Sequence, residues 1–137
     1  MTEKYDLNSE TLPSVFIPHD CVIAQISISS EYLTFIFEND ISYHDSIRFA
    51  NPKYKSLTIR YHLVDETILV HKWKTNRWNV KRSGYMVAET EDLKEWVKHG
   101  LEYISHYVSY NGMMIKLFSE SEIIMELSTD IIEYEWN

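Results

Sequence analysis

The sequence predicts a single α+β domain that is mainly antiparallel β-sheet, with about 7–9 strands in hairpins or a meander and one helix near residues 91–99. Three observations favour this class. Most apolar segments alternate with polar residues at the two-residue period of a half-buried strand. Only one segment combines helical spacing with start and stop signals. The 137-residue chain is 45% hydrophobic with only three glycines and three prolines, so it can bury a sizeable core.

The chain is predicted to begin with a loose, polar segment over residues 1–14. Residues 19–38 then predict a core hairpin with a tight turn at Ser30 and Glu31. In that register one face of the hairpin is continuously apolar, because side chains alternate along a strand. This face consists of Val22, Ala24, Ile26, Ile28, Leu33, Phe35 and Phe37. A short strand is expected at residues 47–49.

Three further strand pairs are expected, each made of two alternating segments separated by a short turn. The turns are placed at Asp65-Glu66, Asn111-Gly112 and Thr129-Asp130. The second is the strongest signal, because Asn-Gly tolerates the positive φ angles of a type I′ turn. Between these pairs lies the helix of residues 91–99, with Thr90 as its N-cap and Gly100 as its terminator. Its apolar stripe is expected to dock on the sheet.

Composition excludes several function classes. Three glycines cannot form a phosphate-binding glycine motif, and no G-x-S-x-G nucleophile motif is present. Cys21 is the only cysteine, so no intramolecular disulfide can form and a cytoplasmic location is expected. No apolar run approaches the length of a membrane span. The net charge of −8 argues against non-specific nucleic-acid binding, and no cofactor is expected.

Charge is distributed unevenly along the chain. The balance is −7 over residues 1–47, +7 over 48–82 and −8 over 83–137. Such segregation marks a partner surface or, more ordinarily, strands that pair opposite charges in a sheet. Residues 72–82 stand out because five basic residues are interleaved with two tryptophans. This pattern suits packing within the fold first, a protein interface second and single-stranded nucleic acid third.

Candidate catalytic and metal-binding residues have simpler explanations. The His-Asp pairs at 19–20 and 44–45 suggest metal-dependent phosphohydrolase chemistry, but turn hydrogen bonds explain both aspartates in a strand-rich chain. His62 and His71 are too few for a zinc site, which usually takes three protein ligands. Cys21 suits a small buried hydrophobe better than a nucleophile. Glu133 and Glu135, with or without Glu126, fit a solvated strand face better than a glycosidase carboxylate pair.

The candidate binding surface combines the basic, aromatic stretch with acidic residues near the C-terminus. Its members are Lys72, Trp73, Lys74, Arg77, Trp78, Glu126, Glu133 and Glu135. A protein partner is expected to use it, because no catalytic constellation is present and tryptophan is a common interface anchor.

Residues 19–37, HDCVIAQISISSEYLTFIF, begin with a His-Asp pair, continue with I-x-x-I and end in an alternating L-x-F-x-F strand. In this pattern, and in its C-terminal EYEW, the sequence resembles small bacterial β-rich domains, some of which are immunity proteins that neutralise polymorphic toxins. The resemblance implies a domain that acts by binding and carries no catalytic residue. With the acidic charge, it predicts a non-enzymatic protein-binding module, of the immunity type, acting through an acidic surface. The alternative is a small-ligand or single-stranded nucleic-acid binder using residues 72–82.

Overall fold

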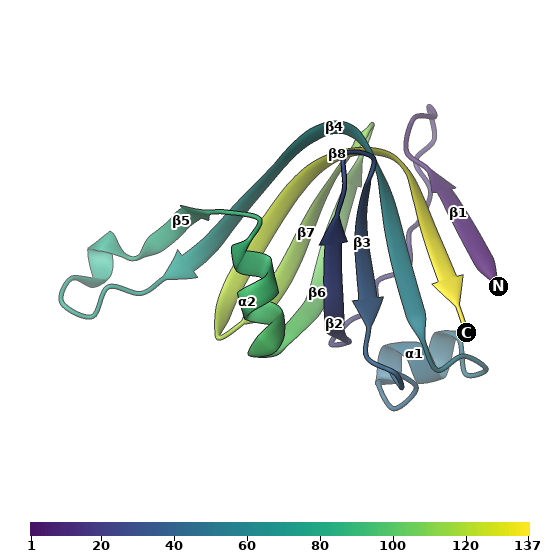
Figure 1. The fold of residues 1–137 in the computed structure, drawn as a ribbon, viewed down its shortest axis with the longest axis horizontal. Helices are drawn as coiled ribbons and strands as arrows, with labels where there is room; N and C mark the ends of the chain where they lie inside the picture. The colour runs from purple at the N-terminus through teal and green to yellow at the C-terminus, as the bar shows by residue number, and fades with distance from the viewer.

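The strands of the protein form one antiparallel sheet of eight strands (Figure 1). The structure is a computed structural model that describes residues 1–137. Its strands are β1 (Thr2–Asp6), β2 (Val22–Ile28), β3 (Tyr32–Phe37), β4 (Leu57–Lys74), β5 (Gly84–Ala88), β6 (Leu101–Ser109), β7 (Gly112–Ser119) and β8 (Ser121–Trp136). Its helices are α1 (Asp45–Ala50), the 3₁₀ helix η1 (Val80–Arg82) and α2 (Asp92–Lys98). Neither α-helix is long and apolar enough to cross a membrane. The predicted α+β class with a mainly antiparallel sheet is confirmed, although the single expected helix is joined by α1.

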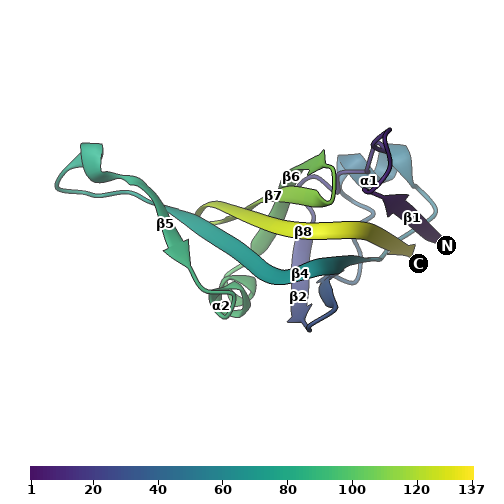
Figure 2. The same cartoon turned by 90° about the horizontal axis from the view of Figure 1, so that it is seen from above.

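Two long strands, β4 and β8, join the two halves of the sheet, because they pair with each other almost from end to end. The start of β4 and the end of β8 lie between β3 and β1. The end of β4 and the start of β8 lie between β5 and β7. β2 pairs with β3 and, at Val22 and Ile23 only, with β6. The pairings β8-β7-β6-β2-β3-β4 therefore return to β8, and the sheet closes on itself. Figure 2 shows β4 and β8 side by side across the top of the molecule.

The core lies inside the folded sheet and contains 27 buried apolar residues. Alternate side chains of β4 and β8 point into it, as the two-residue period of a strand requires. The polar atoms of large aromatic side chains in the core form hydrogen bonds. The Tyr134 hydroxyl donates to the Phe16 carbonyl at 2.5 Å, and Trp136 Nε1 donates to Glu3 Oε1 at 2.6 Å. These bonds avoid the cost of burying an unpaired donor.

Two of the predicted hairpins are wrong, because the chain continues where the sequence suggested a reversal. Residues 57–74 form the single strand β4, and residues 121–136 form the single strand β8. At the predicted turn of Asp65 and Glu66, the register between β4 and β8 shifts as four residues bulge outward. An alternating pattern is the same for two paired strands and for one bent strand, so it did not distinguish them.

The predicted loose segment at residues 1–14 is also wrong. Thr2–Asp6 form β1, which pairs with the end of β8, and the Leu7 side chain beyond it is fully buried. The short strand expected at 47–49 is helical instead and belongs to α1, which buries Ile47 against the core. Both differences come from contacts with residues far along the chain, which local polarity does not reveal.

The first predicted hairpin is confirmed, with its turn closed by the Ser29 N–H donating to the Tyr32 carbonyl. A bulge at Ala24 shifts the register, so Ile23 rather than Ala24 lies opposite Phe37 and enters the core. The hairpin of β6 and β7 is also present, but its turn is centred on Tyr110 and Asn111, one residue before the predicted Asn111-Gly112, so Val108 lies opposite Met113.

The predicted helix is confirmed as α2. It ends as expected at Gly100, whose φ of +89° favours glycine. Thr90 does not cap it, because the N-cap position is Glu91 and no side chain makes the capping bond. Leu93 is its buried residue, and it holds the helix against β2 and β6.

Trp136→Ala and Trp78→Ala form a matched pair, because they truncate the same side chain at a fully buried and at a 97% exposed position. We expect Trp136→Ala to lower the free energy of unfolding by about 3–5 kcal/mol, because it leaves a cavity in the core. Trp78→Ala should change it by less than about 0.5 kcal/mol. Urea denaturation followed by circular dichroism measures both values, and equal effects would contradict the burial of Trp136.

Candidate protein-binding surfaces

The basic residues predicted at 72–82 lie mainly on a hairpin arm that projects from the body of the protein. We define the arm as residues 74–86, which run from the end of β4 through η1 into β5. In Figure 1 it extends to the left, beyond α2, with η1 at its tip. Only β4 and β5 pair within it, so it has no third strand to cover it.

Exposed cations surround an exposed tryptophan on the arm. Trp78 is 97% exposed, and the neighbouring cations Lys74, Arg77, Lys81 and Arg82 are exposed and form no ion pair. A shallow groove of about 400 Å³ lies beside Trp78 and is lined by three of these cations, together with Thr75, Asn76 and Met86. No carboxylate lines this groove.

Side-chain hydrogen bonds to the backbone fix the tip of the arm. Asn76 Oδ1 accepts from the N–H groups of Trp78 and Asn79, both at 3.0 Å. The Asn76 N–H donates to Ser83 Oγ at 2.8 Å, which ties the two sides of the loop together. Short-range bonds that asparagine is well suited to make therefore connect the residues of the tip.

Lys72 and Trp73 lie at the base of the arm and take part in the fold. The Lys72 ammonium lies 5.1 Å from the centre of the Trp96 ring and donates to the Ser119 carbonyl. Partial burial lowers its pKa. The Trp73 ring packs edge-on against Tyr85 at 5.2 Å between ring centres. The structure thus separates the predicted basic stretch into a packed base and a free tip.

The three predicted carboxylates do not form one site. Arg60 donates to Glu135 at 2.7 Å, and this hydrogen bond lowers the pKa of the Glu135 carboxyl. Lys4 lies 3.5 Å from Glu133. A glutamate held ionised in this way is a poor general acid, so the carboxylate-pair interpretation gains no support. Glu126 forms no ion pair and lies apart from both.

Glu126 belongs instead to an acidic patch at the bend of β4. We define this acidic patch as Val64, Asp65, Glu66, Leu69 and Glu126, all of which are exposed. Leu69 and Glu126 are cross-strand neighbours, and a depression of about 350 Å³ beside them is lined in part by Asp65. The patch was not predicted, because residues 64–67 were assigned to a hairpin turn rather than to a bulge beside β8.

The two His-Asp pairs, distant in sequence, meet in one shallow depression. His19 and Asp20 lie there with His44 and Asp45. His19 Nδ1 donates to a backbone carbonyl at 2.8 Å, and Asp45 pairs with Arg48. No three His, Cys, Asp or Glu side chains are positioned to share a metal ion.

Of the remaining candidate catalytic and metal-binding side chains, Cys21 and His62 are buried or paired within the fold. Cys21 is fully buried, and burial raises the pKa of its thiol to about 12, so it is not a reactive thiolate at neutral pH. His62 lies 2.6 Å from Asp130, across the β4–β8 pairing. Because β4 is continuous, His62 and His71 are well separated along it and do not share a site.

His106 is a buried histidine that belongs to none of these surfaces. Its Nε2–H donates to the Val15 carbonyl at 2.9 Å, and its Nδ1 accepts from the Tyr103 hydroxyl at 2.5 Å. Burial lowers the pKa of His106, so the neutral ring is the form that the fold holds.

Comparison with known proteins gives partial matches to protein flp. Protein flp of Staphylococcus aureus, in strains N315 and COL, is 38% identical to this chain over 66 residues. These residues are 48% of this chain but only 13% of protein flp, so the chain spans a small part of the relatives it matches. No family model matches the chain, and no solved structure matches it. The comparisons therefore identify neither a family nor a catalytic class.

The buried histidine predicts a pH dependence of stability. Because the pKa of His106 is lowered on folding, the unfolded chain binds its proton at a higher pH than the folded chain. The stability contributed by neutral His106 is complete above the unfolded pKa of about 6.5 and is lost as the pH falls through that value. Urea unfolding from about pH 7.5 to pH 5.5 should therefore show a smaller loss of stability in His106→Gln than in the unmodified protein. Equal losses would assign the dependence to other groups.

Proposed function

We propose that this chain is a non-enzymatic protein-binding module whose arm docks on an acidic surface of a partner. The observation that carries the proposal is Trp78, which is 97% exposed at the end of a projecting hairpin. Nothing in the fold uses this side chain, whereas the other three tryptophans pack against neighbouring aromatic or basic residues.

The energetic argument is that Trp78 can gain much by becoming buried at an interface. A tryptophan side chain covers roughly 150–250 Å² of apolar surface, which corresponds to about 4–6 kcal/mol at 25 cal/mol per Å². Part of that gain is lost to ordering on association. Because Asn76 already fixes the tip, less conformational entropy remains to be lost on binding.

The charge distribution favours an acidic partner for the arm. Five of the thirteen Lys and Arg residues lie in residues 72–82, which contain no acid. The other residues carry eight cations and twenty-one acids, a balance of −13. The arm is therefore a local cationic element on an anionic protein, and complementary potential would orient it toward an acidic surface during encounter.

An immunity-type inhibitor, which the sequence resemblance implies, is a second form of this function. The acidic patch supports it, because three unpaired carboxylates surround the exposed apolar side chains of Val64 and Leu69. Such a patch suits a basic partner, as many toxin nucleases are, and an anionic body would accelerate their encounter. In this form the acidic patch, rather than the arm, makes the central contact.

Nucleic-acid or small-ligand binding by the arm remains the alternative. The groove beside Trp78 offers a stacking ring next to Arg77 and Arg82, the combination that single strands require. The balance of −13 outside residues 72–82 opposes a polyanion, because that charge would repel phosphates beyond the arm. A protein partner, whose acidic area can be limited to the arm, meets less repulsion.

The arm is tested with the immobilised protein and its variants Trp78→Ala and Arg77→Glu. We expect the unmodified protein to retain a specific protein from a lysate of the cells that encode it. Each substitution should weaken the binding of that protein, once purified, by about 2 kcal/mol or thirtyfold in calorimetry. Phe49→Ala is the matched control, because Phe49 is an 81% exposed aromatic on α1, outside the arm.

Two outcomes contradict this proposal. If no protein is retained, the proposal of a protein-binding module is overturned. If a partner binds equally well to the Trp78 and Arg77 variants but is lost on Glu126→Lys, the acidic patch makes the contact. The latter result would favour the immunity-type form.

Titration with single-stranded oligonucleotides separates the alternative from the main proposal. The fluorescence of exposed Trp78 would report any base that stacks on it. We expect no saturable change at physiological salt, because the body repels phosphates. A saturable quenching that disappears in Trp78→Ala would instead support the nucleic-acid binder.

A further inference from the structure

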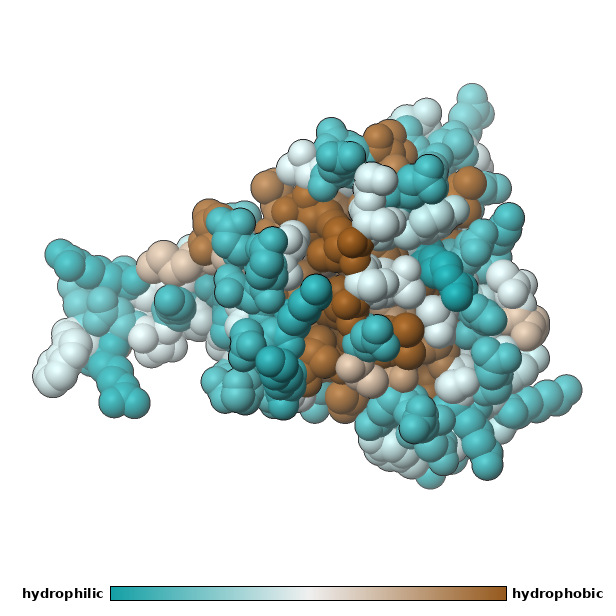
Figure 3. Space-filling view, viewed as in Figure 1, coloured by the Kyte–Doolittle hydropathy of each residue, from teal (hydrophilic) through white to brown (hydrophobic).

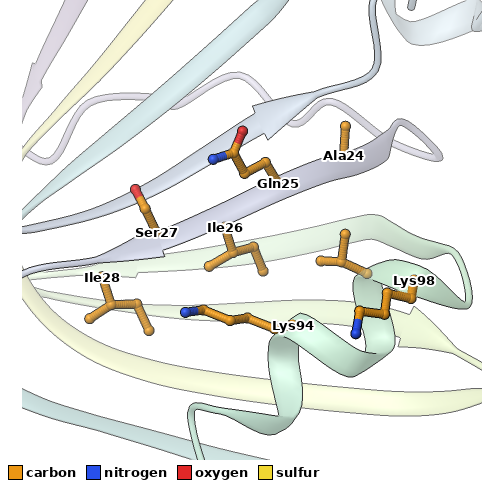
Figure 4. Close-up of a pocket in the computed structure, with 8 residues that line it drawn as sticks. Ala24, Gln25, Ile26, Ser27, Ile28, Lys94 and Lys98 are labelled. Carbon is orange, nitrogen blue, oxygen red and sulfur yellow. The ribbon is translucent and has the colours of Figure 1, made fainter.

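A third surface lies between β2 and α2, on the face of the body that Figure 3 shows. β2 leaves β6 after Ile23, and from there its edge is bordered by the helix α2 instead of by a strand. The space between them is a groove of about 450 Å³ lined by Ala24, Gln25, Ile26, Ser27, Ile28, Lys94, Val97 and Lys98 (Figure 4). It shares no residue with the arm.

The edge of β2 in this groove carries unused backbone hydrogen-bonding groups. The Ser29 N–H donates to the Tyr32 carbonyl, and Ser27 lies opposite Thr34. In an antiparallel pair these bonds alternate, so the N–H and C=O groups of Ile26 and Ile28 point away from β3. Beyond Ile23 no strand pairs with this edge, and neither residue makes a backbone hydrogen bond in a turn or loop.

The walls of the groove combine apolar and cationic side chains. Ile26, Ile28 and Val97 provide an apolar floor, and Figure 3 shows brown, hydrophobic surface between α2 and β2. Lys94 extends toward Ile28 along the groove, while Lys98 lies at its other end (Figure 4). Lys94 forms no ion pair, and Lys98 pairs with Glu95 of the same helix at 3.1 Å. No acidic residue lines the groove.

We propose that this groove binds an extended, acidic peptide segment of a partner protein as an added β-strand. Its backbone would pair with Ile26 and Ile28, which is the mode by which strand edges capture peptides. One alternate set of its side chains would contact the apolar floor, and the other set would place carboxylates near Lys94 and Lys98. This extends the proposed binding function to a second site and does not depend on the arm.

The length and charge of the groove define the segment. The exposed edge from residue 24 to residue 28 accommodates about five residues of an extended chain at roughly 3.3 Å each. The unpaired cation Lys94 and the absence of an acid in the lining favour carboxylates over cations in that segment. Free edges also exist on β1 and β5, but no helix packs on β1, and the smaller depression of about 270 Å³ between β5 and α2 is lined in part by the acid Asp92. The β2 edge therefore offers side-chain recognition in addition to backbone pairing.

The proposal is tested with a fluorescein-labelled peptide of alternating valine and glutamate, by fluorescence anisotropy on the full chain. We expect saturable binding of this peptide and none of its valine–lysine counterpart. N-methylation of one alternate set of peptide amides should abolish binding, because that set pairs with the edge, whereas N-methylation of the other set should not. If neither set of N-methylated peptides loses binding, strand addition is overturned.

Variants of the protein locate the site. Lys94→Glu combined with Lys98→Glu should weaken binding about tenfold, since two attractive contacts become repulsive. Lys53→Glu combined with Lys55→Glu is the matched control, because it makes the same charge change at exposed positions outside the groove. Equal weakening by both double variants would overturn the assignment to the groove.

Ile28→Pro removes one donor from the edge without breaking the β2–β3 ladder, because the Ile28 N–H points away from β3. We expect it to lower peptide affinity while the circular dichroism spectrum is retained. If the variant fails to fold, the N-methyl peptides still decide the question. If the unmodified chain dimerises and Ile28→Pro abolishes the dimer, the edge binds a second copy of the chain. That result would overturn the proposal.

The proposals for the arm and for the groove can be overturned independently of each other. Peptide binding that is unchanged in Trp78→Ala supports the groove even if the arm has no partner. Retention of a partner by the arm with no peptide binding would overturn the groove and leave the proposed function intact.

Discussion

The pairing of β4 with β8 is the interaction on which the rest of the structure depends. The two strands contribute side chains to both halves of the folded sheet. Their outer edges pair with β3 and β1 in one half and with β5 and β7 in the other. Opposed pairs such as Ile59 with Tyr134 and Val70 with Met125 place large apolar side chains on the enclosed face at both ends of the pairing. The bulge at residues 64–67 lets both strands bend together without losing that face.

The candidate surfaces arise where strand lengths do not match around the closed sheet. β4 continues beyond the last residue that pairs with β8, and only β5 accompanies it, so the chain projects as the arm. β2 continues after β6 has diverged, so one of its edges opens into the groove beside α2. The bulge that bends β4 exposes the acidic patch. Each surface is therefore a consequence of the same closed architecture: the acidic patch and the arm lie at the bend and at the end of β4, and the groove lies between β2 and α2.

Opposite charges are separated in the sequence but partly reunited in the fold. Arg60 from the basic segment pairs with Glu135 from the acidic C-terminal segment, which supports the ordinary explanation of charge segregation for those residues. The cations at the tip of the arm have no such partner. The charge pattern thus combines structural ion pairs with a cationic element that is free to meet a partner.

Local patterns determined the strand-rich class, the first hairpin and its turn, the helix α2 and its end at Gly100, because each depends on neighbouring residues. They also placed Trp78 and Arg77 among the candidate binding residues, because the density of cations and tryptophan is visible in the sequence. Only the tertiary structure decided that residues 57–74 form one bent strand, that residues 2–6 add to β8, and that Lys72 packs at the base of the arm. It alone revealed the edge of β2, because whether a backbone group is paired depends on a strand that lies far away in the sequence.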